Sequence, residues 1–263
     1  MNIYLLYIIC GSIGGFLGGL LGLGGGIIFV PSLFFIFTMY GLNQEYLMQS
    51  AVSTSLACVV VSSLSAAIKH NKNKLINWTI FYKMLPGLIL GSVLGVMLLT
   101  LFSSSTIKFY YGILLIIISV FLILEKNQYN HSNKTKKFRF INVFSFFTGS
   151  ISTMLGIGGG TLTTPYFKFY GECMKRSIAT AAACGVPIAL FGIIITSVIN
   201  KITGIFDHTP IDFIELDSFL IISISTVIFS YIGAGVTFIT NITLLKNIFS
   251  ITLLAIGLTI LFY

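Results

Sequence analysis

The stretch Gly22-Leu-Gly-Gly-Gly26, followed by Pro31, returns later in the chain as Gly156-Ile-Gly-Gly-Gly160, followed by Pro165. In both copies the proline lies nine positions after the first glycine. Each glycine weakens a helix by roughly 1 kcal/mol relative to alanine, so four of them within five positions are expected to unwind it. Proline is favoured at the start of a helix, and Thr164 is a suitable N-cap for one beginning at Pro165. The two stretches predict two broken helices, each with a new helix starting near its proline.

Long apolar segments surround both glycine stretches. Of the 263 residues, 56% are apolar and 8% are charged, whereas soluble domains carry roughly 25% charged residues. A membrane-spanning helix needs about 20 apolar residues. We therefore expect an all-α integral membrane protein with about eight transmembrane helices. The candidate segments are 3–37, 50–68, 80–101, 107–124, 140–170, 176–199, 219–239 and 244–262.

A second pair of matching segments supports a division into two halves. Residues 48–58 and 174–184 share methionine, threonine, alanine and cysteine at equal spacing. Between the halves lies a polar, basic stretch, 125–139. We predict a first transmembrane repeat over 1–124, a linker over 125–139 and a second repeat over 140–263. Each repeat would have four spans and open with a glycine-broken helix, and both parallel and inverted arrangements remain open.

The basic residues predict an orientation. The net charge is +8, but the basic residues are scattered between apolar runs and form no basic face, which argues against nucleic-acid binding. With eight crossings, the larger group of Lys and Arg falls on the side of both termini, and Lys168, Lys175 and Arg176 fall on the other side. The positive-inside rule then places both termini in the cytoplasm.

The glycine breaks also suggest a binding site. A helix N-terminus exposes unpaired N–H groups and about half a positive charge, and glycine lets a ligand approach them. Hydroxyl groups beside the breaks could add hydrogen bonds, although such groups in membrane helices also bond their own backbone. The expected anion-binding residues are Gly24, Gly25, Gly26, Pro31, Thr54, Ser55, Gly158, Gly159, Gly160, Thr161, Pro165 and Thr180.

Other glycines favour helix packing. Gly11, Gly15 and Gly19, and likewise Gly87, Gly91 and Gly95, recur at four-residue spacing. Small residues at this spacing let membrane helices approach closely.

Features of an enzyme are missing from the predicted spans. All seven acids lie in loops or near segment ends, and His70, His131 and His208 lie between spans. No Gly-Lys dipeptide forms a phosphate-binding loop, and the four cysteines are dispersed. We expect no catalysis, no metal and no cofactor.

These motifs resemble the TauE/SafE sulfite exporter family. The resemblance is carried by both glycine stretches with their prolines, by Ala51-Val-Ser-Thr-Ser-Leu56, by Pro86-Gly87 with Gly91 and Gly95, and by Ala179-Thr-Ala181. It implies an eight-span secondary transporter that exports small sulfur-containing anions, such as sulfite, sulfoacetate or other sulfonates. The chain departs from the pattern in its second half, which has no clean Pro-Gly-x-x-x-Gly run.

The resemblance also implies a setting. We expect a multi-pass protein of the bacterial inner membrane whose partners are a small anionic substrate and the lipid bilayer, with a homodimer as the candidate assembly and no nucleic acid. The alternatives are a permease for another small organic anion, such as a carboxylate, and a structural membrane protein without transport activity.

Overall fold

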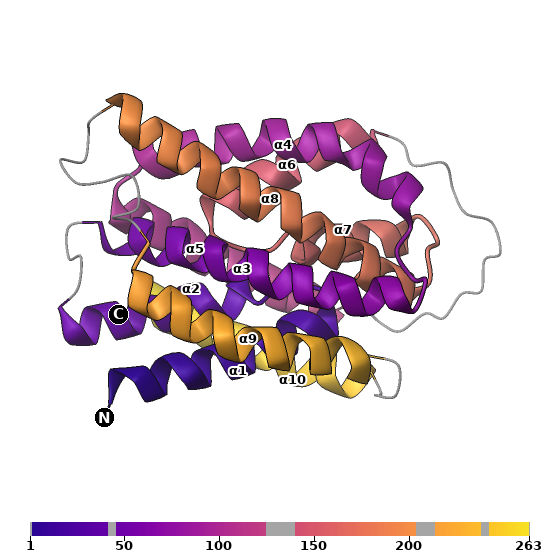
Figure 1. Cartoon of the computed structure of the whole chain (residues 1–263), viewed down its shortest axis with the longest axis horizontal. Coiled ribbons are helices and arrows are strands. Elements are labelled where there is room, and N and C mark those ends of the chain that lie inside the picture. The colour runs from indigo at the N-terminus through magenta and orange to yellow at the C-terminus, as the bar shows by residue number, and fades with distance from the viewer. Residues whose placement is uncertain (1, 42–45, 125–139, 204–213, 238–241, 263) are drawn as a thin grey trace.

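Ten helices form the described part of the chain, with no strand among those residues (Figure 1). The computed structural model describes residues 2–41, 46–124, 140–203, 214–237 and 242–262. The predicted all-helical class is confirmed, whereas the proposed linker 125–139 lies outside the described residues. The helices are α1 (Ile3–Leu21), α2 (Gly26–Tyr40), α3 (Leu47–Lys72), α4 (Trp78–Leu101), α5 (Ser104–Leu124), α6 (Ile141–Met154), α7 (Gly160–Phe169), α8 (Met174–Thr203), α9 (Leu216–Val236) and α10 (Ile242–Phe262).

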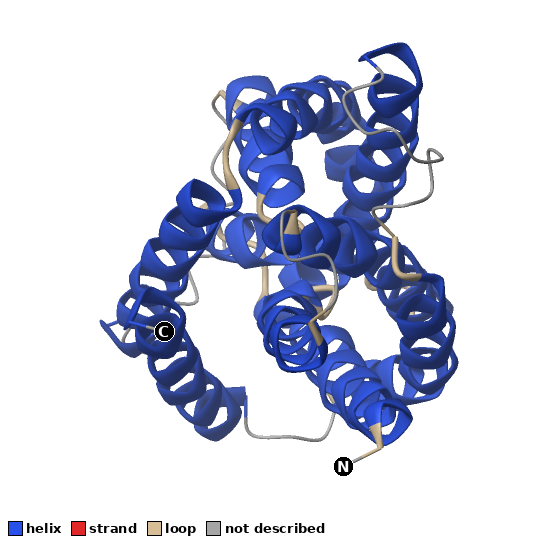
Figure 2. Cartoon of the chain, turned by 90° about the vertical axis from the view of Figure 1, so that its left-hand side faces the viewer, coloured by secondary structure: helices blue, strands red, loops and turns tan. Residues whose placement is uncertain are grey.

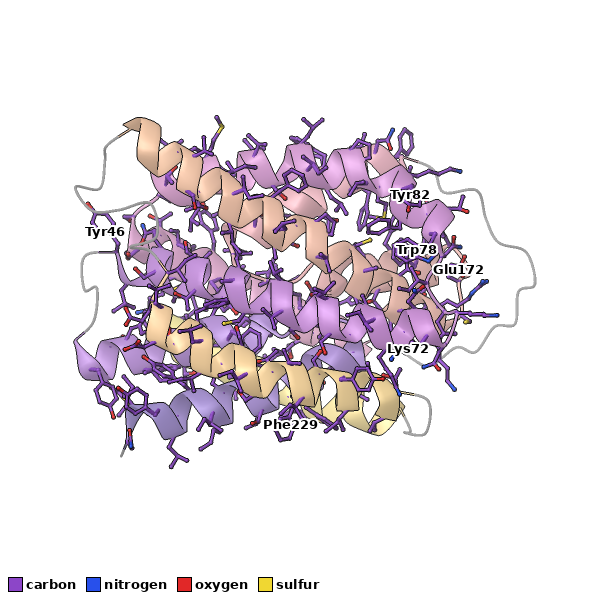
Figure 3. The ribbon with its side chains drawn as sticks, viewed as in Figure 1. Tyr46, Lys72, Trp78, Tyr82, Glu172 and Phe229 are labelled. Atoms are coloured by element: carbon purple, nitrogen blue, oxygen red, sulfur yellow. The ribbon has the colours of Figure 1, made fainter. Side chains whose placement is uncertain are left out.

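Six of the described helices are long and apolar enough to cross a membrane. They are α1, α3, α4, α5, α8 and α9. Large apolar side chains cover the outside of the bundle, among them Leu101, Ile224 and Phe229. Figure 3 labels Phe229. In water such a surface would be unstable, whereas lipid is a suitable solvent for it. The number of eight spans is not confirmed by these residues and stays a prediction.

The chain reverses direction at the first glycine break. A methyl group added at Gly14 of α1 would collide with the ring of Phe29 in α2, and one at Gly18 would meet the backbone of Gly25. Helix α2 therefore returns alongside α1 instead of continuing it. The predicted start of the new helix near Pro31 is wrong, because α2 begins at Gly26.

The second break departs from the prediction in the same way. Helix α7 begins at Gly160, with Gly159 as its N-cap. Thr164 is therefore an interior residue of α7 and not the predicted N-cap. Both prolines lie in the second turn of their helices. A proline at this place removes one hydrogen bond of the helix, the bond to the carbonyl four residues earlier.

The packing partners of the first five helices correspond to those of the last five. Helix α1 packs along α9 as α6 packs along α4, and α3 contacts α9 as α8 contacts α4. Helices α3 and α8 also pack against each other, and they run in opposite directions (Figure 1). Figure 2, which looks nearly along the helix axes, shows the resulting bundle. These contacts fit an inverted arrangement of two halves.

Glycine seams hold the first helix of each half against the other half. Methyl groups at Gly11, Gly15 and Gly19 would collide with the backbone or side chains of α9. Methyl groups at Gly87, Gly91 and Gly95 of α4 would collide with α6 in the same way. The prediction that these glycines serve close helix packing is confirmed.

The distribution of basic side chains corrects one prediction. Glu172, just before α8, accepts a hydrogen bond from Asn77, just before α4, at 2.9 Å. Lys175 and Arg176 therefore lie at the same end of the molecule as Lys72, which Figure 3 shows at the same end as Glu172. The sequence-based division placed them on opposite sides, because it counted each glycine break as part of a single crossing.

His70 is a second correction. It lies in the last turn of α3 and is fully buried, although the sequence placed it between spans. Helix α3 is longer than the apolar run that predicted it, because its last turn extends past Ile68 to Lys72.

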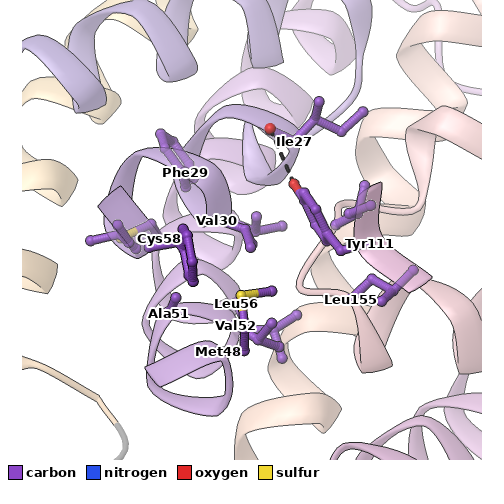
Figure 4. Close-up of a cluster of buried hydrophobic side chains, with 14 of the residues drawn as sticks. Ile27, Phe29, Val30, Met48, Ala51, Val52, Leu56, Cys58, Tyr111 and Leu155 are labelled. Atoms are coloured by element: carbon purple, nitrogen blue, oxygen red, sulfur yellow. Dashed lines mark hydrogen bonds between the residues drawn. The ribbon is translucent and has the colours of Figure 1, made fainter. Parts of the chain in front are cut away.

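A buried apolar cluster fills the space beside the first break (Figure 4). It joins α2, α3 and α5, and Leu155 of the second half packs with them. Phe29, Leu56 and Tyr111 are completely buried within it. This cluster fixes α2 against α3 and so positions the first glycine break.

Candidate functional site

The two glycine breaks contact each other at the middle of the bundle. A methyl group at Gly26 would collide with the carbonyl oxygen of Gly156, and one at Gly160 would collide with that of Gly22. The Cβ position of Gly24 lies 3.3 Å from Cα of Gly158. The contact is reciprocal, so each break needs glycine partly because the other break occupies the space.

Each break presents the N-terminus of a helix to this contact. In α2, Ile28 and Phe29 donate from their N–H groups to the carbonyl of Gly25, at 2.9 and 3.0 Å. In α7, Leu162 and Thr163 donate in the same way to Gly159, at 3.3 and 3.0 Å. The N–H groups before them have no acceptor within the helix. The predicted helix N-termini are therefore present, at Gly25–Ile27 and Gly159–Thr161.

The backbone at Gly25 shows why the first break requires glycine for its conformation as well. Its φ is +79°, in the left-handed region, and Gly24 beside it has a φ of +72°. A side chain in this region is strained. Alanine at either position would therefore suffer backbone strain in addition to the steric contacts.

Pro31 leaves a carbonyl free, and a side chain from another helix uses it. Proline has no N–H, so the carbonyl of Ile27, four residues earlier, has no donor in α2. The hydroxyl of Tyr111 in α5 donates to this oxygen at 3.1 Å (Figure 4). Pro31 thus has a structural role here, and Pro165 occupies the equivalent place in α7.

Several predicted hydroxyl groups hold backbone atoms of the breaks. Ser55 of α3 donates to the carbonyl of Gly156 at 2.9 Å, which ties the first half to the second break. Thr161 donates to the carbonyl of Gly158 at 3.3 Å. Both are buried. They position the breaks, and any contact with a ligand would require these bonds to be exchanged.

Thr54 and Thr180 each cap a helix of the opposite half. The backbone N–H of Glu215, the N-cap residue of α9, donates to the hydroxyl oxygen of Thr54 at 3.1 Å. The N–H of Asn77, the N-cap residue of α4, donates to that of Thr180 at 3.0 Å. We call these two bonds the Thr54 latch and the Thr180 latch. From the sequence, Thr54 and Thr180 were expected either to bind a ligand or to bond within their own helices. In the structure they accept hydrogen bonds from helix starts of the other half.

The latches lie away from the crossing of the breaks, so the structure does not bring all the predicted residues together. The glycines, Ser55 and Thr161 meet at the crossing. Thr54, although next to Ser55 in the chain, contacts the start of α9, and Thr180 contacts the start of α4. The matched pair Thr54 and Thr180 was the sequence signal for the latches, but the sequence does not show their partners.

Comparison with known proteins now identifies the family. The family model described as sulfite exporter TauE/SafE matches residues 7–262. The chain belongs to the TauE/SafE family. It is thus a multi-pass integral membrane protein of a transporter family, as the resemblance of its motifs implied.

Relatives of this TauE/SafE protein are named only as transporters. It is 25% identical over 256 residues to a "probable membrane transporter protein" of Haemophilus influenzae, covering 97% of this chain and 96% of the relative. A relative of that description in Methanocaldococcus jannaschii is 28% identical over 229 residues, covering 87% and 84%. One in Bacillus subtilis is 33% identical over 188 residues, covering 62% and 66%. No solved structure matches the chain.

The crossing in this TauE/SafE protein is lined by neutral groups. The buried polar side chains of the described residues are serine and threonine, with Gln49 and His70 near the ends of α3. The described carboxylates lie outside the spans or at their ends, and partial burial together with the negative charge of Asp217 raises the pKa of Glu215. An anion at the crossing would meet hydrogen-bond donors without a repelling carboxylate.

Sequence reasoning missed one polar group at the crossing. Ser63 of α3 is buried, and its hydroxyl has no hydrogen-bond partner in the part of the chain that the structure describes. Its oxygen lies 2.7 Å from the Cβ position of Gly24. Ser63 belongs to a serine-rich run of α3, and nothing in that run distinguishes it from Ser62 or Ser65 before the packing is known.

Proposed function

We propose that this protein is a secondary transporter that exports small sulfur-containing anions, such as sulfite or sulfonates, across the bacterial inner membrane. The observation that carries the proposal is the crossing of two helix N-termini in a buried region where the described residues place no ionised side chain. Family membership supports transport, and the crossing supports an anion as the transported solute. The choice of sulfur oxyanions rests on the family description.

The site would bind its anion through the backbone. Helix N-termini carry a partial positive charge and free N–H donors, and they bind phosphate and sulfate in many proteins. In a buried region these interactions are screened less than in water. The two breaks are in contact in this structure, so an anion would enter when the halves move apart on one side.

The two halves suggest how access could alternate. The packing of α1 on α9 and of α4 on α6 joins elements of different halves into two units, while α3 and α8 cross between them. Rocking of such units around a central site is the usual mechanism of transporters with inverted halves. The crossing would then face first one side of the membrane and then the other.

Gly159→Ala is the variant that tests the site with least damage. The added methyl group would displace only the Cδ1 end of Ile188, since the next neighbours are at 3.8 Å or more. It would sit at the N-terminus of α7, where the anion is proposed to bind. We expect KM for radiolabelled sulfite in proteoliposomes to rise roughly tenfold, as expected for a loss of about 1.4 kcal/mol of binding.

Gly235→Ala is the matched control. Its Cβ position has only Cε of Lys69 nearby, at 3.4 Å, so this variant should transport as the unmodified protein does. Sulfonates should compete with sulfite, and acetate should not. Folded protein that gives no sulfite flux above empty liposomes would contradict the proposal. Uptake of labelled acetate would then support the carboxylate permease instead.

A further inference from the structure

Ser63 is a buried polar residue at the crossing of the breaks. It is 1% exposed and its hydroxyl has no partner among the described residues, whereas the neighbouring Ser62 and Ser65 of α3 are bonded. Ser65 donates to the carbonyl of Val227 at 2.8 Å, and Ser62 donates to Ser230 at 3.4 Å. A buried hydroxyl normally finds a partner, so an unpartnered one needs an explanation.

The Ser63 hydroxyl lies beside Gly185 of α8, close to the N-terminus of α7. The Cβ position of Gly185 in α8 lies 2.6 Å from the Ser63 oxygen and 4.0 Å from the nitrogen of Gly159. Gly185 thus separates the hydroxyl from the N-cap residue of α7. Gly24 borders the hydroxyl on the side of the first break, with its Cβ position 2.7 Å from that oxygen.

This arrangement occurs on one side of the molecule only. Ser63 follows Cys58 by five positions, and the same place after the matching Cys184 holds Ala189. Gly185 directly follows Cys184, and the same place after Cys58 holds Val59. The hydroxyl and the glycine that exposes it to α7 are therefore both departures from the match between the halves. The matching packing of the two halves therefore does not explain why Ser63 and Gly185 occupy these positions.

We propose that Ser63 donates a hydrogen bond to a small oxyanion bound at the N-terminus of α7, and that Gly185 leaves the room for it. The inference deepens the proposed function and rests on it for the class of solute. The anion would accept from the Ser63 hydroxyl and from the N–H groups of Gly159 and Gly160. The same hydroxyl borders Gly24, which precedes the N-cap residue of α2, so it lies between the two helix N-termini.

Thermal unfolding of the purified full chain in detergent tests this directly. The probes are sodium sulfite, methanesulfonate and acetate, with chloride as a salt control. We expect sulfite to raise Tm of the unmodified protein and of Ser65→Ala, and to leave Tm of Ser63→Ala unchanged. In liposomes, KM for sulfite should rise about tenfold in Ser63→Ala, the effect of losing one hydrogen bond to a charged group.

The unfolding data without anion separate binding from a structural role. Ser63→Ala removes an unpartnered hydroxyl, so its Tm should equal or exceed that of the unmodified protein, whereas Ser65→Ala should be lower. Equal stabilisation of Ser63→Ala and the unmodified protein by sulfite would overturn the inference. So would a low Tm of Ser63→Ala without anion, or the absence of any oxyanion effect on the unmodified protein. Stabilisation that depends on Ser63 without sulfite flux would support the site and refute the transport proposal.

Discussion

Near the breaks, single side chains replace backbone hydrogen bonds that a proline removes from its helix. Pro31 removes the N–H that would have paired with the Ile27 carbonyl, and Tyr111 supplies a hydroxyl from another helix. In the membrane interior no water can replace this donor. Tyr111 is also fully buried, so its ring fills space in the apolar cluster while its hydroxyl satisfies the backbone.

Tyr111→Phe should therefore destabilise the protein by about 1–3 kcal/mol, the usual cost of leaving a buried acceptor unpaired. Reversible unfolding in mixed micelles measures it. In a Pro31→Ala background the new N–H of residue 31 can reach the Ile27 carbonyl, so the cost of Tyr111→Phe should shrink. An equal cost in both backgrounds would show that the hydroxyl does not compensate for the proline.

At this scale the sequence predicted residue types better than it predicted their partners. The glycines at positions 22–26 and 156–160 do form the breaks, and the new helices begin at the last glycine of each stretch. The hydrogen-bond partners of Thr54, Ser55 and Ile27 lie 161, 101 and 84 residues away along the chain. Such pairings depend on how the halves pack, and local spacing carries no information about it.

At the scale of elements, the two latches connect each half to a helix start of the other. Helix α9 begins against Thr54, and α4 begins against Thr180. The latches lie near opposite ends of the bundle, because α3 and α8 run in opposite directions (Figures 1 and 3). A rocking motion that opens one end would have to break the latch at that end and could keep the other.

Thr54→Val and Thr180→Val should each loosen one helix start. Hydrogen exchange followed by mass spectrometry should show faster exchange around residues 215–219 in Thr54→Val and around 77–81 in Thr180→Val, with an opening free energy lower by about 1 kcal/mol. Thr100→Val is the control, since Thr100 bonds only to carbonyls of its own helix in the described contacts. Uniformly faster exchange in both variants would argue against separate latches.

At the scale of the whole molecule, charge is concentrated at one end. Among the residues whose side chains are described, Lys69, Lys72, Lys74, Lys83, Lys168, Lys175 and Arg176 lie at the end where α3 finishes and α4 and α8 begin. Lys108, near the start of α5, lies at the other end. The chain termini lie at that other end as well (Figure 1). The positive-inside rule then favours a cytoplasmic basic end and external termini, opposite to the sequence-based orientation.

Cys173 offers a native probe of this orientation. It is exposed next to Glu172 at the basic end, while Cys10, Cys58 and Cys184 are buried. We expect a membrane-impermeant maleimide to label it in inverted vesicles of a bacterial host and not in intact spheroplasts. Cys173→Ser should abolish the labelling. Labelling in spheroplasts alone would restore the orientation with cytoplasmic termini.

The sequence predicted a lipid environment and an all-α fold, because a chain with 8% charged residues has too few of them to cover a surface that faces water. It could not predict that the chain turns back at each glycine break. Unwound backbone can continue straight or reverse, and the choice depends on whether Phe29 packs against Gly14. The wrong prediction for the side of Lys175 and Arg176 followed from treating each break as part of a single crossing.

The glycine seams have a consequence for how the protein is made. Helix α1 packs on α9 and α4 packs on α6, so the first half enters the membrane before either of its partners has been synthesised. Until then the small-residue faces of α1 and α4 must lie against lipid chains, which fill such grooves poorly. The first half therefore needs the second half to cover these faces. A nascent chain interrupted in the middle would leave a fragment in which the small-residue faces of α1 and α4 have no packing partner.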